Sequence, residues 1–107
     1  MASGRADPEA LATHFHGAGD SERAAVHAAE AAAQAAEALA FDRAARLYRL
    51  ALELHAPDDP RDMVLRVKLA AALANAGRGR EAAENYLRAA QGAAPDEFLD
   101  LQRRAAE

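Results

Sequence analysis

The chain has 107 residues, with thirteen basic side chains among seventeen acidic ones, a formal net charge of −4 and no cysteine. This length suits one domain with a modest core, and the scattered positive charge argues against a nucleic-acid partner. The lack of cysteine excludes a disulfide framework and thiol chemistry. No apolar run is as long as a signal peptide or a membrane span, so we expect a cytoplasmic protein without a membrane partner.

Alanine makes up about a third of the chain, and the start and stop signals around its alanine-rich runs predict about six helices. Asp7-Pro8 combines a helix cap with proline at the first helical position, and Gly19 supplies a stop. Asp20 or Ser21 caps the next helix. The helices are expected at about residues 8–17, 21–39, 42–55, 60–76, 80–91 and 95–107.

Further signals set the middle boundaries. Asp42 follows Phe41 as a cap after a hydrophobic staple residue. Pro57 disfavours helix in the residue before it, and Asp59-Pro60 repeats the cap-plus-proline start. The short loops between these helices predict antiparallel neighbours.

An internal repeat decides the architecture. Residues 18–25 return as residues 76–83, and each copy follows one helix and opens another. The apolar positions before the two copies also match, namely Leu11, Ala12 and Phe15 with Leu69, Ala70 and Leu73. Helix pairs that repeat in this way cannot bury their apolar faces alone, so they stack on each other. We therefore predict one all-α domain over residues 1–107.

This pattern resembles the tetratricopeptide repeat (TPR), a helix-turn-helix unit of about 34 residues. The best copy has the repeat's positions at Leu69, Ala70, Leu73, Gly77, Ala82, Tyr86 and Ala89. An earlier copy has Leu11, Ala12, Phe15, Gly19, Ala24, Ala28 and Ala31, and a partial copy, equivalent to a second helix, has Phe41, Ala44, Tyr48, Ala51 and Pro57. Gly19 and Gly77 are 58 residues apart, so the helix at 21–39 must belong to two successive pairs. The resemblance implies an antiparallel helix-hairpin solenoid.

Residues 11–25 and 39–54 are similar to helical segments of large bacterial serine/threonine kinases and ATPase-type signalling regulators, where such repeats follow the catalytic module. This resemblance implies a protein–protein interaction segment taken from a longer chain. It brings no catalytic residue with it, and neither a phosphate-binding loop nor a kinase motif is present. We expect no enzyme activity and no cofactor.

The residues best suited to chemistry have simpler structural explanations. His14 and His16 point to different sides of a helix, and the other two histidines are scattered, so we expect no metal site. Tyr48 and Tyr86 occupy equivalent repeat positions, which predicts buried packing between helices.

In repeats of this kind, the first helix of each pair lines the concave face, which predicts the binding residues. They are Val64, Val67, Lys68, Ala71, Ala74 and Asn75 in the best copy, and Glu9, Thr13 and His16 in the earlier one. Related grooves can hold a peptide carboxylate with a lysine–asparagine–arginine clamp, but Glu9 and Thr13 stand where lysine and asparagine would be needed. The small, mildly apolar trough that remains suits an amphipathic helix of a partner protein.

The expected last helix provides an alternative function. Phe98, Leu99 and Leu101 would have no later helix to cover them, and uncovered apolar patches usually mark contacts. The alternative is a structural element that forms a homodimer through these residues. Dilution separates the two functions, because only a self-associating chain changes its mass with concentration.

Overall fold

The computed structural model describes residues 7–56, 59–91 and 103–105, and all regular structure in these residues is helical. Five helices follow one another, namely α1 (Pro8–Gly17), α2 (Ser21–Glu37), α3 (Phe41–Leu54), α4 (Arg61–Asn75) and α5 (Gly79–Ala90). Residues 103–105 form a further helical turn. The described residues contain no strand, which confirms the all-α prediction. Most of the helix expected at 95–107 lies outside them.

Aspartates define three of the helix starts. Asp7, Asp20 and Asp59 each accept a hydrogen bond from a backbone N–H at the beginning of α1, α2 and α4. These bonds satisfy donors that have no partner inside the helix. The third helix differs from the prediction, because it begins at Phe41 and Asp42 lies inside its first turn. The predicted cap at Asp42 is therefore wrong.

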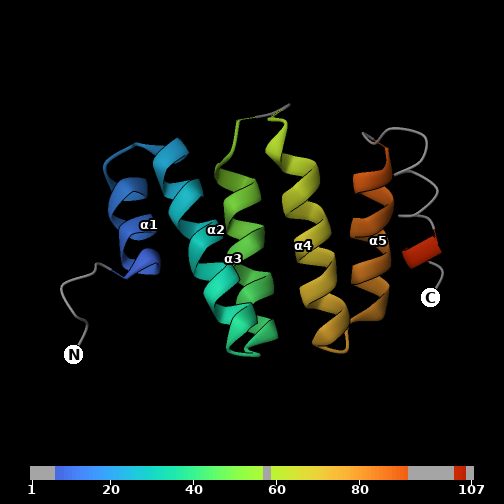
Figure 1. Cartoon of the computed structure of the whole chain (residues 1–107). Helices are drawn as coiled ribbons and strands as arrows, with labels where there is room; N and C mark the ends of the chain where they lie inside the picture. Colours follow the sequence, from blue (N-terminus) through green and yellow to red (C-terminus); the bar gives the residue numbers. More distant parts are fainter. Residues whose placement is uncertain (1–6, 57–58, 92–102, 106–107) are drawn as a thin grey trace.

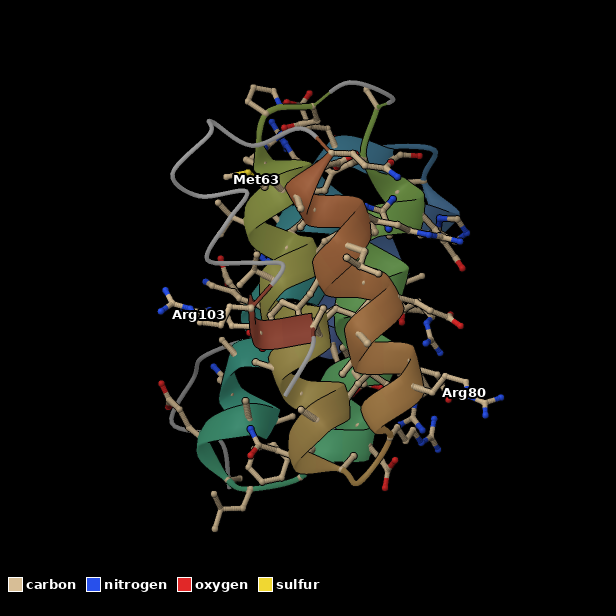
Figure 2. The ribbon with its side chains drawn as sticks, turned by 90° about the vertical axis from the view of Figure 1, so that its right-hand side faces the viewer. Met63, Arg80 and Arg103 are labelled. Atoms are coloured by element: carbon tan, nitrogen blue, oxygen red, sulfur yellow. The ribbon has the colours of Figure 1, made fainter. Side chains whose placement is uncertain are left out.

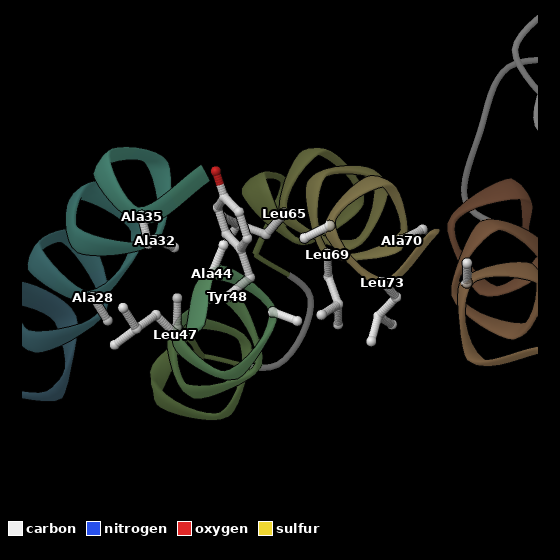
Figure 3. Close-up of a cluster of buried hydrophobic side chains, with 14 of the residues drawn as sticks. Ala28, Ala32, Ala35, Ala44, Leu47, Tyr48, Leu65, Leu69, Ala70 and Leu73 are labelled. Atoms are coloured by element: carbon white, nitrogen blue, oxygen red, sulfur yellow. The ribbon is translucent and has the colours of Figure 1, made fainter. Parts of the chain in front are cut away.

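The helices form a row in which each one packs on the next (Figure 1). As a result, α2 contacts both α1 and α3, and α4 contacts both α3 and α5. The row is staggered, and Figure 3 shows α2 and α4 next to each other on the same side of α3. This stagger leaves α2 and α4 as the two walls of a channel above α3.

Alanine fills most of the core. Ala28, Ala32 and Ala44 are completely buried, whereas Leu69 and Leu73 are the largest side chains that are less than 2% exposed in the described residues. Both leucines belong to α4, which packs on α3 and on α5 (Figure 3). Because alanine removes little apolar area from water, close helix approach and these few large side chains must supply the stability.

Three of the helix connections use the same turn. Gly19, Leu39 and Gly77 have φ angles of 81°, 61° and 82°. After each of them, a backbone N–H bonds to the carbonyl five residues earlier at 2.8 Å, in the pairs Asp20 to Phe15, Ala40 to Ala35 and Arg78 to Leu73. This is the Schellman arrangement, which needs a left-handed residue just after the helix. It ends α2 at Glu37, two residues before the predicted end.

The shared turn reveals a closer correspondence between hairpins than the two glycines suggest. Leu39 and Gly77 are 38 residues apart, and so are many matching residues of the α2–α3 and α4–α5 hairpins. The identical pairs are Arg23 and Arg61, Val26 and Val64, Ala32 and Ala70, Ala33 and Ala71, Ala36 and Ala74, Ala38 and Ala76, Ala44 and Ala82, Ala45 and Ala83, Tyr48 and Tyr86, and Ala51 and Ala89. The two hairpins are therefore equivalent in sequence and in turn geometry.

Candidate functional site

A groove runs between α2 and α4, with α3 beneath it. Its wider part has a volume of about 420 Å³ and its narrower end about 190 Å³. Lys68 lines both parts, so the two hollows adjoin on α4 and together follow the two helices. The other lining residues are Val26, Ala29, Glu30, Ala33 and Ala36 of α2, Phe41, Tyr48 and His55 from α3 and its C-terminal cap, and Arg61, Val64, Leu65, Ala71, Ala72 and Asn75 of α4.

Helical spacing explains why these residues share the groove. On α2, Ala29, Ala33 and Ala36 recur at intervals of three and four residues, so they lie on one face. Residues at the same intervals form the opposing wall on α4. The α2 wall is built largely from alanine, whose side chain does not reach across the channel, and the channel therefore stays open.

The mouth of the groove is apolar. Only four large hydrophobic side chains are exposed in the part of the chain that the structure describes, and two of them are Val26, at 38%, and Val64, at 49%. These two valines come from opposite walls of the wider part. Single exposed apolar residues are ordinary on a protein surface, but a pair that borders one hollow indicates a contact site.

Tyr48 forms the floor of the narrower end. Its side chain is almost completely buried, and its hydroxyl points out between α2 and α4 (Figure 3). Burial, together with the nearby charge of Glu37, raises the pKa of this hydroxyl. The groove therefore holds a neutral hydroxyl that can donate or accept a hydrogen bond. The burial of Tyr48 and Tyr86 also confirms the packing role predicted for both.

A polar cluster closes the other end. Asp59 accepts hydrogen bonds from the Arg61 side chain at 3.0 Å and 2.8 Å. These bonds are the main reason why the pKa of Asp59 lies well below its ordinary value. The buried His55 has its Nδ1 atom 3.2 Å from a carboxylate oxygen of Asp59, without hydrogen-bond geometry. The cluster joins the end of α3 to the start of α4 and holds Arg61 at the groove.

The structure brings together four of the residues predicted for the binding face. Val64, Lys68, Ala71 and Asn75 all line the groove. Val67 instead turns toward the core and is partly buried against it. Ala74 lines a different hollow, next to α5.

The predicted residues of α1 lie away from this groove. Glu9 forms an ion pair with Arg43 of α3, and Thr13 donates a hydrogen bond to the carbonyl of Glu9 at 3.1 Å. His16 is exposed near the end of α1. Because α2 already separates α1 from α4, these side chains do not meet the α4 wall. The terminal-helix residues, Phe98, Leu99 and Leu101, lie outside the described residues.

Sequence reasoning missed the α2 wall, the Tyr48 floor and the cluster around Asp59. The α2 wall carried a readable signal, the spacing of Ala29, Ala33 and Ala36, but the groove prediction used only α1 and α4 as first helices. The helix at 21–39 is itself predicted to belong to two successive pairs, and including it among the groove-lining first helices would have identified this wall. The contact between His55 and Asp59 could not be predicted from the sequence, in which the two residues are only known to be four positions apart.

No protein-family model, curated protein or solved structure matches the chain. Within the described residues, no three histidine or acidic side chains are placed to hold a metal ion together. None of the helices in that part of the chain is both long and apolar enough to cross a membrane. The groove between α2 and α4 is therefore the feature from which function has to be inferred.

Proposed function

We propose that the chain is a protein-interaction module, a TPR-like solenoid of stacked helix hairpins, whose α2–α4 groove binds an amphipathic helix of a partner protein. The observation that supports this most is the pair of exposed valines, Val26 and Val64, on the two walls of one trough. Binding a partner removes this apolar surface from water, which favours association.

The lining of the groove favours a helical partner over an extended peptide tail. Its hollows are narrow, and alanines form much of the lining, so one stripe of apolar side chains fits between α2 and α4. The charged groups are few and of both signs, with Glu30 on α2 and Lys68 and Arg61 on α4, and Arg61 is already bound to Asp59. A groove for a terminal carboxylate would need several converging cations.

We further propose that the module acts in a cytoplasmic signalling protein of a bacterium. This rests on the resemblance of residues 11–25 and 39–54 to helical segments of large kinases and ATPase-type regulators. In that setting the module recruits a partner and leaves the chemistry to other domains.

Binding of a designed helix tests the proposed groove. The probe is a fluorescein-labelled, alanine-based helical peptide with leucines at positions i, i+4 and i+7, titrated with the full chain and followed by anisotropy. Val64→Glu and Val26→Glu should each weaken binding about tenfold or more, because they place a charge in the apolar mouth. Leu87→Glu is the matched control, since Leu87 is 45% exposed on α5 and does not line the groove. Equal binding by Val64→Glu and wild type would reject the groove.

A further inference from the structure

The face of α5 toward the C-terminal turn is more open than its counterpart on α3. Ala45 is only 2% exposed, whereas Ala83, the matching residue 38 positions later, is half-buried. Ala83 lines a hollow of about 660 Å³ together with Ala74, Gly77, Gly79, Ala82, Tyr86, Arg104 and Ala105. The same surface of the α2–α3 hairpin is covered by α4.

The helical turn at 103–105 covers part of the corresponding surface of the α4–α5 hairpin. Ala105 and Val67 are 38 residues apart, and both are partly buried against the core. Along the row the turn lies beyond α5 from α4 (Figure 1), and in the view along the row it is displaced to the same side as α4 (Figure 2). The turn therefore lies against the α4–α5 hairpin on the side on which α4 lies against the first hairpin, and it borders the hollow through Arg104 and Ala105. The hollow corresponds to the place of the two turns of α4 that contain Leu69, Ala72 and Leu73.

A glycine makes the hollow deeper than its counterpart. Phe41 lines the narrow end of the α2–α4 groove, and the residue 38 positions later is Gly79. A Cβ atom built on Gly79 would meet no atom within 4 Å, and its backbone does not have the left-handed conformation that favours glycine. Neither a close approach nor the backbone thus requires glycine at this position, and among the described residues no side chain takes the place on α5 that Phe41 has on α3.

We propose that this hollow is a second docking site, which binds a partner helix on α4–α5 in the way that α2–α3 binds α4. The occupant is an amphipathic helix with leucine and alanine at the spacing of Leu69, Ala72 and Leu73, and with a large apolar side chain opposite Gly79. In α4, which packs on α3 and on α5, those three side chains are at most 4% exposed. The site is separate from the α2–α4 groove and does not depend on its proposed function.

The α4 sequence itself is the appropriate probe. A fluorescein-labelled peptide with the sequence of residues 60–76 is titrated with the full chain, and anisotropy reports binding. We expect saturable binding that is lost when the peptide carries Leu69→Asp and Leu73→Asp, because these changes remove its apolar stripe. If the wild-type chain does not bind this peptide, the proposal is overturned.

Substitutions that fill the hollow test whether the peptide binds there. Gly79→Phe, which copies the residue at the equivalent position of α3, should weaken peptide binding about tenfold or more. Gly17→Phe is the matched control, because a Cβ at Gly17 also meets nothing within 4 Å but lies at the end of α1. Ala74→Glu, an exposed position in the α4 wall of the hollow, should give the same loss even if Gly79→Phe impairs folding. Unchanged binding by folded Gly79→Phe and Ala74→Glu would place the peptide elsewhere and refute the site.

Discussion

The α2–α3 and α4–α5 hairpins share their turn geometry and many of their residues, but they differ in what covers them. In the first hairpin, Ala45 and Tyr48 are buried and Tyr48 lies beside α4, whereas the equivalent Ala83 borders an open hollow. The same residue type at equivalent positions is therefore core in one hairpin and surface in the other. The difference shows that the solvent exposure of an alanine in this chain depends on whether another helix packs over it.

The hairpins also differ in where they place large side chains. Leu69 and Leu73 of α4 correspond to Ala31 and Ala35 of α2. All four residues are buried, but only the leucines remove much apolar area from water. Since α4 packs on both α3 and α5, these leucines connect the two hairpins. We infer that α4 contributes more to stability than its length suggests.

Truncation of a leucine in α4 should have the largest effect. Leu73 is completely buried, so Leu73→Ala should destabilise the fold by about 2–5 kcal/mol through lost burial and the cavity that remains. Urea unfolding followed by circular dichroism measures this. Leu87→Ala, at a position that is 45% exposed, is the control and should change the stability by about 0.5 kcal/mol or less. Equal midpoints for the two variants would show that α4 does not hold the hairpins together.

Enlarging the equivalent alanines tests the difference in coverage directly. Ala45→Leu should cost about 1–3 kcal/mol, because its 2% exposed side chain has no room to grow under α4. Ala83→Leu should stay within about 0.5 kcal/mol of wild type, since the new side chain extends into the hollow. The measurement is the pair of urea midpoints at an unchanged slope. A similar cost at both positions would mean that the hollow is closed in solution.

Local signals in the sequence predicted the helices to within about two residues at most ends. Caps such as Asp7, and prolines such as Pro57, act on the adjacent backbone, so one sequence suffices to read them. The α4 wall of the groove followed from helical spacing in the same way. The α2 wall did not, because the predicted groove includes only the helices at 8–17 and 60–76, although the helix at 21–39 also belongs to two pairs.

The remaining features depend on contacts between helices. Nothing in the sequence predicts that His55 lies beside Asp59, or that Ala45 is buried whereas Ala83 borders a hollow. A leucine at positive φ is also unfavourable locally, by about 1–2 kcal/mol, and persists because packing of α2 on α3 determines the turn. Tertiary packing overrides local preference at these places, and a single sequence does not display tertiary packing.

Replacing Leu39 by glycine should make the first hairpin more like the second. Leu39→Gly should stabilise the fold by about 0.5–1 kcal/mol, because glycine adopts positive φ without strain but loses more entropy on folding. Leu39 is 73% exposed, so little packing is lost. Leu39→Ala is the matched control, which shortens the side chain but keeps an L-residue at φ of 61°, and it should give no gain. Thermal unfolding compares the variants, and the same midpoint for glycine and alanine would contradict a strained turn.

The smallest expected effect concerns the cluster that joins the first hairpin to α4. Hydrogen bonds from Arg61 hold the pKa of Asp59 below its ordinary value of 3.8, and His55 acts in the same direction. A lowered pKa in the folded chain means that ionised Asp59 stabilises the fold at pH values above the unfolded value, and this contribution decreases as the pH falls toward the folded value. Asp59→Asn should therefore lower the urea midpoint at pH 7 and 5, and the difference from wild type should shrink below about pH 4.

Asp42→Asn is the control, since Asp42 forms an exposed ion pair with Arg78, at 3.2 Å. A difference for Asp59→Asn that stays constant down to pH 2.5 would show that its charge does not stabilise the connection between α3 and α4.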